Sequence, residues 1–237
     1  MTFQRYWSLL LLLPFLSCSV LKEDDHAQRT YHPNGKLHKE INKDKSGTGT
    51  YKEYFDNGQL FQEVTFVNNL REGMVKQYYN TGILYQETPY KKGRSHGIQK
   101  RYRRSGALMS EVPYHEGNIC KGLKEYTVDG KVKERYPTIV VNTINNVRND
   151  GTFIVELSLS DSTKNDVEYF KGKLTEGKYL SEGLQRFGNV KEGVGKLVYK
   201  IKKGSVIDHE EYFVARVRTY QGNYYLAETT VPLSIRF

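Results

Sequence analysis

Short runs of alternating apolar and polar residues recur along the first half of the chain, separated by turns that contain glycine. Five similar decamers carry this pattern: YHPNGKLHKE from Tyr31, YFDNGQLFQE from Tyr54, YYNTGILYQE from Tyr78, YRRSGALMSE from Tyr102 and YTVDGKVKER from Tyr126. Successive copies begin 23 or 24 residues apart, and a fixed period is typical of repeat proteins. Because alternation with period two indicates strands, each decamer predicts a β-hairpin.

Glycine occupies the fifth position of every decamer. We interpret these glycines as structural turn residues: Gly35, Gly58, Gly82, Gly106 and Gly130. The preceding residue is Asn or Asp in three copies. Asn-Gly and Asp-Gly favour two-residue type I′ turns, in which both central residues need positive φ. We therefore expect a two-residue loop in these copies, whereas Thr-Gly and Ser-Gly in the other two are weaker signals and leave a different turn open.

A two-residue loop fixes which side chains lie opposite each other. It places Tyr54 opposite Phe61 and, further from the turn, a cation opposite a glutamate. The predicted charge pairs are Arg29–Glu40, Lys52–Glu63, Lys76–Glu87 and Lys100–Glu111. Such pairs contribute roughly 0.2–1 kcal/mol each, so we interpret these glutamates as structural rather than catalytic. In the fifth copy Lys124 would face Arg135, which indicates the end of the array.

The segments between the decamers predict reverse turns, since each ends in a second glycine before the next hairpin. Pro89 and Pro113 occupy the same place in successive repeats, and proline cannot donate a ladder hydrogen bond, so the strands should end or bulge there. Neither face of the sheet is continuously apolar. We expect an antiparallel meander of about ten strands, elongated, twisted and largely single-layered, over residues 29–136.

A different pattern begins at Pro137. Runs such as TFIVELSLS, EYFVARVRTY and YYLAETTVPLSIRF alternate between turn signals. Several short strands in about 100 residues are typical of a β-sandwich of the immunoglobulin or fibronectin type. The predicted fold class is thus all-β, with a hairpin repeat sheet followed by an immunoglobulin-like sandwich over 137–237.

The N-terminal segment predicts export. Arg5 precedes an apolar run from Trp7 to Leu16, which is typical of a secretory signal over residues 1–17. The sequence FLSC resembles the lipobox of bacterial lipoproteins, which implies cleavage before Cys18 and lipidation of its thiol. Residues 18–28 are polar and predict a flexible tether. Their acidic run, 23–25, resembles a surface-export signal; a solvated linker is the other interpretation.

Composition narrows the function classes. The net charge of +9 permits acidic partners, but Lys and Arg are spread along the chain and export argues against nucleic acid. Cys120 has no second exported cysteine to pair with and predicts a half-buried free thiol. No nucleophile, phosphate-binding or metal-binding motif occurs, and the run Asp208–Glu211 predicts a solvated turn rather than a cation site. We expect no enzyme activity, no cofactor and no metal.

The repeat resembles a known family. The pattern Gly-x-x-Lys-x-Tyr-Tyr-x-x-Gly-x-Leu-x-x-Glu-x-x-Tyr, nearly intact from Gly73 to Tyr90, is similar to the MORN repeat variant. Proteins built from it are often labelled YwqK-family antitoxins. The resemblance covers residues 31 to about 136, and it implies a hairpin repeat sheet with no catalytic residues.

The leading functional hypothesis is a non-catalytic lipoprotein of the cell envelope that acts as a protein-binding, glycan-binding or structural repeat module. Acyl chains would anchor it in the outer membrane, and surface exposure is left open. The candidate binding surface lies at the centre of the array: Tyr78, Tyr102, Lys76, Lys100 and Arg103. Aromatic side chains there supply rigid contact area. Two other classes stay open, an antitoxin or immunity protein and, more remotely, a hydrolase of envelope polymers.

Overall fold

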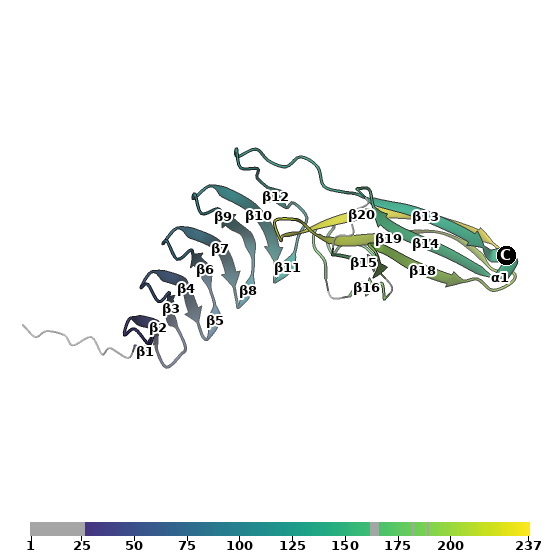
Figure 1. Cartoon of the computed structure of the whole chain (residues 1–237). Coiled ribbons are helices and arrows are strands. Elements are labelled where there is room, and N and C mark those ends of the chain that lie inside the picture. Colours follow the sequence, from purple (N-terminus) through teal and green to yellow (C-terminus); the bar gives the residue numbers. More distant parts are fainter. Residues whose placement is uncertain (1–26, 162–165, 182, 189) are drawn as a thin grey trace, which may run out of the picture.

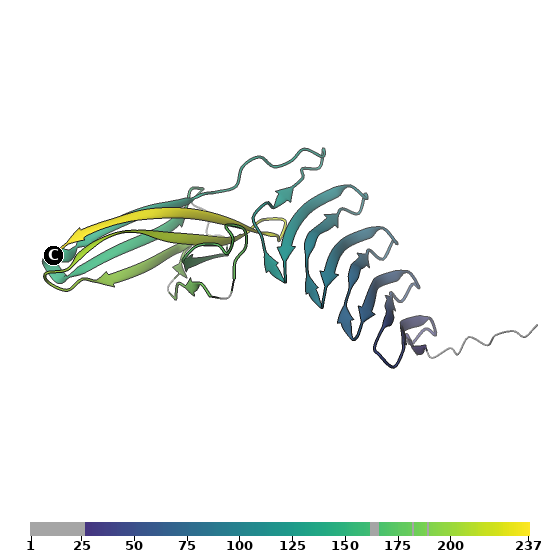
Figure 2. The same ribbon diagram turned by 180° about the vertical axis from the view of Figure 1, so that it is seen from behind.

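The computed structural model describes residues 27–161, 166–181, 183–188 and 190–237. Strands make up most of these residues, and the one helix among them is the short α1 (Val147–Asp150), which confirms the predicted all-β class. A repeat sheet and a sandwich follow each other along a long molecule, with β1 and the C-terminus at opposite ends (Figures 1 and 2).

Twelve strands of the described chain form the antiparallel repeat sheet. Their bounds are β1 Gln28–Tyr31, β2 Leu37–Lys43, β3 Gly49–Tyr54, β4 Leu60–Val67, β5 Leu70–Arg71, β6 Gly73–Tyr78, β7 Leu84–Lys91, β8 Arg94–Ser95, β9 Gly97–Tyr102, β10 Leu108–His115, β11 Asn118–Ile119 and β12 Lys124–Glu125. The long strands pair in chain order, and β5, β8 and β11 pair back on the strand just before them. The hairpins form a row of curved arches in one layer, as predicted (Figures 1 and 2).

The turns inside the decamers differ from the predicted two-residue loops. The Gly58 amide donates to the Phe55 carbonyl at 2.9 Å, and the Phe55 amide donates to the Gln59 carbonyl at 2.8 Å. Gly58 has φ +91°, whereas Asn57 does not have a positive φ. This arrangement is a type I turn followed by a glycine in the left-handed region, which forms a G1 bulge. The same hydrogen bond from the glycine amide, and the same positive φ, occur at Gly35, Gly82, Gly106 and Gly130.

The side chain of Asn57 adds hydrogen bonds that stabilise this turn. Its Oδ1 accepts a hydrogen bond from the Gln59 amide at 2.9 Å, and its Nδ2 donates to the Asn80 carbonyl of the next hairpin at 2.7 Å. Asn34 donates in the same way to the Asp56 carbonyl at 2.7 Å. Asparagine therefore joins neighbouring turns instead of adopting the left-handed conformation itself.

The bulge shifts the register next to the turn. Tyr54 pairs with Leu60, so the predicted Tyr54–Phe61 pair is wrong. Ring contacts instead join Phe55 to Phe61 at 5.1 Å between centroids, and the equivalent pair in the third hairpin at 5.0 Å. Beyond the bulge the predicted register is confirmed, with Lys52 opposite Glu63 and the other three charge pairs also opposite each other.

Type I′ turns occur in the connections rather than in the decamers. Asn68 and Asn69, with φ +50° and +63°, join the paired residues Val67 and Leu70. Lys92–Gly93 and Glu116–Gly117 have the same pairs of positive φ. The predicted reverse turns are therefore present, and the type I′ turns predicted for the decamers occur in these connections instead.

The two prolines do not end their strands. β7 runs through Pro89 and β10 runs through Pro113. The irregularity lies on the facing strand, where Gly97 has φ +111° and a Cβ would lie 3.0 Å from Cγ of Pro89. Gly97 therefore leaves room for the Pro89 ring.

The fifth decamer does not complete its hairpin. Lys124 lies opposite Glu111 of β10, and the expected contact between Lys124 and Arg135 is wrong. An isolated bridge between Tyr126 and Val132 is the continuation of this copy. The chain leaves the sheet after it, so Arg135 has no facing strand.

Residues 139–236 form a sandwich of two four-stranded sheets in the described part of the chain. Its strands are β13 Ile139–Asn146, β14 Thr152–Leu159, β15 Val167–Lys171, β16 Gln185–Arg186, β17 Val190–Lys191, β18 Val194–Lys200, β19 Val206–Arg218 and β20 Tyr224–Arg236. The orders β13-β14-β18-β17 and β16-β15-β19-β20 correspond to the immunoglobulin-like topology. Every second residue of β14 is buried, and Leu157 packs with Tyr169 and Phe213 of the other sheet in one core cluster.

Substitution of Gly58 tests the turn. Gly58→Ala should lower the free energy of unfolding by about 1–2 kcal/mol, because an L-residue is disfavoured in the left-handed region. Space is not limiting, since the nearest atom to a Cβ would be Cδ of Lys36 at 3.7 Å. Urea unfolding monitored by circular dichroism measures the change. Gly188→Ala, at a glycine without positive φ and with nothing within 4 Å, is the control; an equal effect there would contradict the turn assignment.

Candidate functional site

A row of alternating charges crosses the repeat sheet, and two of the predicted binding residues stand in it. The facing residues follow in this order: Arg29, Glu40, Lys52, Glu63, Lys76, Glu87, Lys100, Glu111 and Lys124. Alternation continues from one hairpin to the next, since Glu63 faces Lys52 in its own hairpin and Lys76 in the following one. Each glutamate therefore has a cation on both sides.

The tyrosine at the first decamer position supports this row. Tyr102 donates its hydroxyl to Oε1 of Glu87 at 2.7 Å, and Tyr126 donates to Oε2 of Glu111 at 2.9 Å. Burial, followed by the hydrogen bond to Glu87, raises the pKa of Tyr102 to about 12. These tyrosines connect each repeat to the glutamate of the repeat before it.

Arg103 also connects repeats. Its Nη2 donates to the Tyr126 carbonyl at 2.6 Å, and Tyr79, at the same position one repeat earlier, donates to the Tyr102 carbonyl at 2.8 Å. The second decamer position therefore links consecutive hairpins. Tyr102 and Arg103 thus form hydrogen bonds between hairpins. Lys76 and Lys100 face glutamates on both neighbouring strands. Tyr78, the remaining predicted residue, lines a groove.

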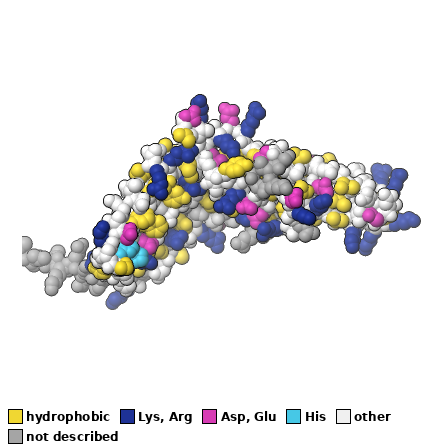
Figure 3. Space-filling model, in the orientation of Figure 1, with side chains coloured by type: hydrophobic (Ala, Val, Ile, Leu, Met, Phe, Trp, Pro, Cys, Tyr) yellow, Lys and Arg dark blue, Asp and Glu magenta, His cyan; other side chains and the backbone are white. Residues whose placement is uncertain are grey.

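The groove lies between the second and third hairpins near their turns and has a volume of about 370 Å³. Its lining residues are Phe55, Asp56, Phe61, Tyr78, Tyr79, Asn80, Tyr85 and Arg104. The two edge-to-face ring pairs described above, one from each hairpin, supply half of these lining residues. On the face seen in Figure 3, hydrophobic side chains gather over the repeat sheet with Lys and Arg between them.

Polar groups accompany these rings. The Arg104 guanidinium lies 4.7 Å from the Tyr79 ring centroid, and its Nη1 donates to Oδ1 of Asn80 at 3.3 Å. The Asp56 carboxylate has no hydrogen bond or ion pair with another described residue. A groove of this kind combines apolar ring faces with a carboxylate acceptor and cationic donors, which suits a ligand that has both apolar faces and hydroxyl groups.

Comparison with protein families identifies the repeat. The MORN repeat variant matches residues 27–42, 48–68, 71–92 and 95–116. Each matched segment contains one complete hairpin of the sheet. The chain carries MORN repeat variants. The incomplete fifth copy and the sandwich lie outside the matched segments, and a comparison with curated proteins gave no match.

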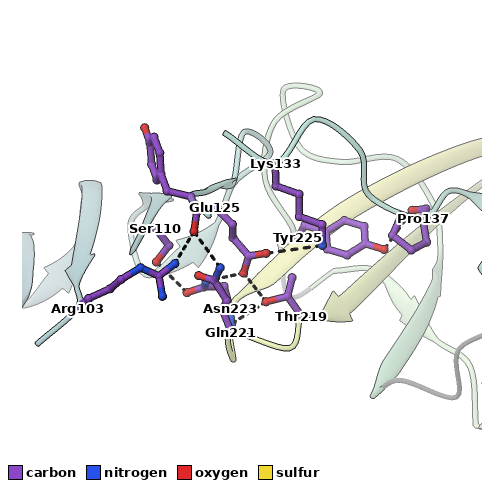
Figure 4. Close-up of polar contacts among 10 residues, drawn as sticks. Arg103, Ser110, Glu125, Lys133, Pro137, Thr219, Gln221, Asn223 and Tyr225 are labelled. Carbon is purple, nitrogen blue, oxygen red and sulfur yellow. Dashed lines mark hydrogen bonds and ion pairs between the residues drawn. The ribbon is translucent and has the colours of Figure 1, made fainter. Parts of the chain in front are cut away.

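The MORN-variant sheet is joined to the sandwich by a buried polar network (Figure 4). The turn between β19 and β20 reaches Glu125, which is 2% exposed. Thr219 donates its hydroxyl to Oε1 of Glu125 at 2.5 Å, and Asn223 donates its Nδ2 to the same oxygen at 2.7 Å. Lys133 places its ammonium group 3.9 Å from Oε2. One oxygen of the buried carboxylate thus accepts two hydrogen bonds, and the other lies near an ammonium group.

Two residues of the last complete repeat, Arg101 and Ser110, bond to Asn223 from the repeat sheet. Arg101 donates through Nη1 to Oδ1 of Asn223 and to the Gln221 carbonyl, both at 3.1 Å, and buried Ser110 donates to Oδ1 at 3.3 Å. Val112 of β10 also belongs to the core cluster of the sandwich. Polar and apolar contacts together fix the orientation of the sandwich on the last repeat.

Sequence reasoning missed these junction residues. Arg101 and Ser110 stand where the preceding repeat has Gln77 and Gln86, as the sheet register shows. The replacement of these two glutamines in the last complete repeat is the sequence signal that could have pointed to the junction. Their partner, the turn around Asn223, is more than a hundred residues away in sequence, so the pairing itself had no local signal.

Several other predictions can be placed. Asp208–Glu211 lies in β19 rather than in a solvated turn, because Glu211 is 8% exposed and accepts from Lys171 at 2.8 Å. Cys120 is a half-buried free thiol whose pKa is raised by burial. The lipidation residue Cys18 and the acidic run lie outside the described residues. Within the described ranges there is no metal-ligand cluster of three or more side chains and no helix able to cross a membrane.

Truncation of Glu125 tests the junction. Glu125→Ala leaves the Thr219 and Asn223 donors unpaired, so we expect unfolding free energy to fall by about 2 kcal/mol or more. Glu134→Ala, at an exposed position, should change it by less than about 0.5 kcal/mol. Urea unfolding of both variants measures the difference. A Glu125→Ala value close to that of the control would mean that the network does not stabilise the junction.

Proposed function

We propose that this chain is a non-catalytic binding protein of the cell envelope that holds a glycan in the aromatic groove of its MORN-variant sheet. The groove carries the proposal, because it places aromatic rings from two hairpins beside a carboxylate, an amide and a guanidinium. Sugar rings offer apolar faces for stacking and hydroxyl groups for hydrogen bonds, and both kinds of group find partners there.

The repeat architecture supports binding rather than chemistry. The glutamates of the charge row each have two cationic neighbours in equivalent positions, so their environments are alike. Acid–base catalysis needs carboxyl groups whose environments separate their pKa values. The charge row is therefore best explained as the support that positions the groove.

The N-terminal segment supplies the proposed location. A lipid-modified Cys18 would attach the chain to an envelope membrane, and residues after it would carry the repeat sheet. In full-length protein expressed in a bacterial host, Cys18→Ser should abolish incorporation of a labelled fatty acid while leaving expression detectable. Ser17→Ala is the control and should retain the label. Equal labelling of both variants would contradict lipidation at this cysteine.

A glycan-array measurement with the full chain tests the groove. Asp56→Asn preserves side-chain size and removes the carboxylate charge, and we expect affinity for the bound glycan to fall by about tenfold or more, because hydrogen bonds to charged groups contribute about 1.5–3 kcal/mol. Phe61→Ala, which removes one ring of the groove, should weaken binding similarly.

Tyr220→Ala is the matched control, since Tyr220 is 87% exposed and lies outside the groove. Its affinity should equal that of the unaltered protein. Thermal unfolding of all three variants separates a loss of binding from a loss of fold. Absence of any bound glycan, together with recovery of one protein partner whose binding depends on Asp56, would replace the glycan with a protein ligand.

A further inference from the structure

The end of the sandwich far from the repeat sheet carries a group of cations, here called the distal basic cluster. It consists of Arg148, Lys200, Lys202, Lys203 and Arg236, all exposed. They come from α1, the end of β18, the following turn and the end of β20. Two hydrogen bonds tie these segments together, from the Ile201 amide to the Gly151 carbonyl at 2.7 Å and from the Gly204 amide to the Phe237 carbonyl at 2.6 Å. Figure 3 shows dark blue side chains around this end of the molecule.

Within the described residues, no member of the distal basic cluster forms an ion pair. Cations along the body of the sandwich do so, as in Lys171–Glu211 at 2.8 Å and Lys196–Glu156 at 2.6 Å. The nearby carboxylate of Asp150 is already bonded to the amide and hydroxyl of Thr152 at 2.9 and 2.6 Å. Asp208, five residues after Lys203, is a further acid near the cluster in the sequence. The five cations outnumber these two acids, so the end of the sandwich is positively charged.

The shape of this end distinguishes between anionic partners. Its cations surround an end of the sandwich instead of lining a hollow, and Val206, in the same region, is 67% exposed. An apolar side chain among cations can be buried at the boundary between lipid headgroups and acyl chains, whereas a soluble polyanion has no apolar region in which to bury it. Cations close to an anionic bilayer are attracted to its surface potential.

We propose that the distal basic cluster binds an anionic lipid surface. The site is separate from the aromatic groove, so the proposal does not depend on glycan binding. Because β1 lies at the opposite end of the molecule, a chain attached by its N-terminal segment would present this cluster away from its own membrane (Figures 1 and 2). The partner would then be a second anionic surface.

A second basic region provides a demanding control. Lys91, Lys92, Arg94 and His96 line a groove of about 370 Å³ at the connection end of the repeats, together with Glu116. This repeat groove is also rich in unpaired cations but includes an acid and lacks the exposed valine. Lys91→Glu with Lys92→Glu changes the net charge by the same amount as Lys202→Glu with Lys203→Glu.

The test uses the full chain with Cys18→Ser, which prevents acylation, immobilised on beads. Fluorescent vesicles of phosphatidylcholine alone, or of phosphatidylcholine with phosphatidylglycerol, are titrated over them. Vesicles with phosphatidylglycerol should reach half-maximal capture at a lower lipid concentration. Lys202→Glu with Lys203→Glu should raise that concentration at least tenfold, since each cation near the surface contributes about fivefold. The control pair at 91 and 92 should leave it within about twofold, and added salt should weaken capture.

Three results would overturn the proposal. Capture that is equal for the two vesicle types would exclude recognition of anionic lipid. An equal loss in both double variants would show that overall charge, not the distal basic cluster, is responsible. Binding of soluble polyphosphate without preferential capture of the anionic vesicles would assign the cluster to a polyanion instead of a lipid surface.

Discussion

The register set by the glycine turn controls the rest of the repeat sheet. In each decamer a glycine with positive φ follows a type I turn and produces a bulge, which decides which residues of the two strands face each other. A slip of one residue would send every side chain to the other face. With the observed register, a lysine or arginine faces a glutamate within each hairpin, and the glutamate faces another lysine on the next strand. The aromatic groove exists because the same register recurs in adjacent hairpins.

A single-layer sheet has little hydrophobic core of its own, so the two parts of this molecule are stabilised by different interactions. Most fully buried side chains lie in the sandwich. The repeat sheet instead has facing opposite charges, several of which form ion pairs, together with tyrosine hydroxyl hydrogen bonds and backbone hydrogen bonds between turns. Individual surface pairs contribute little, but a continuous row is a network in which each member has two neighbours. The last repeat is different, because it joins the sandwich core through Val112 and a buried carboxylate at Glu125.

The repeat could be predicted from the sequence because its period and its charge pairs are local and recur. The all-β class, the one-layer meander and the register of Lys52 with Glu63 all followed from that recurrence. The turn type did not, because Asn-Gly is compatible with both a type I′ turn and a bulged type I turn. In the copies with asparagine, the bulged turn is further supported by a bond from that side chain to the next hairpin, which a single decamer does not contain. The Glu125 network was also inaccessible, since Thr219 and Asn223 lie 94 and 98 residues from Glu125 in the sequence.

The charge row has one further consequence, which concerns how the array ends. It begins with Arg29 in β1 and finishes with Lys124 in β12, so both borders of the alternation are positive. Stacking one molecule on another in continuous register would set cation against cation at the new boundary. A sheet made of near-identical units, which could otherwise grow into a filament, thus has a charge mismatch at each potential point of growth.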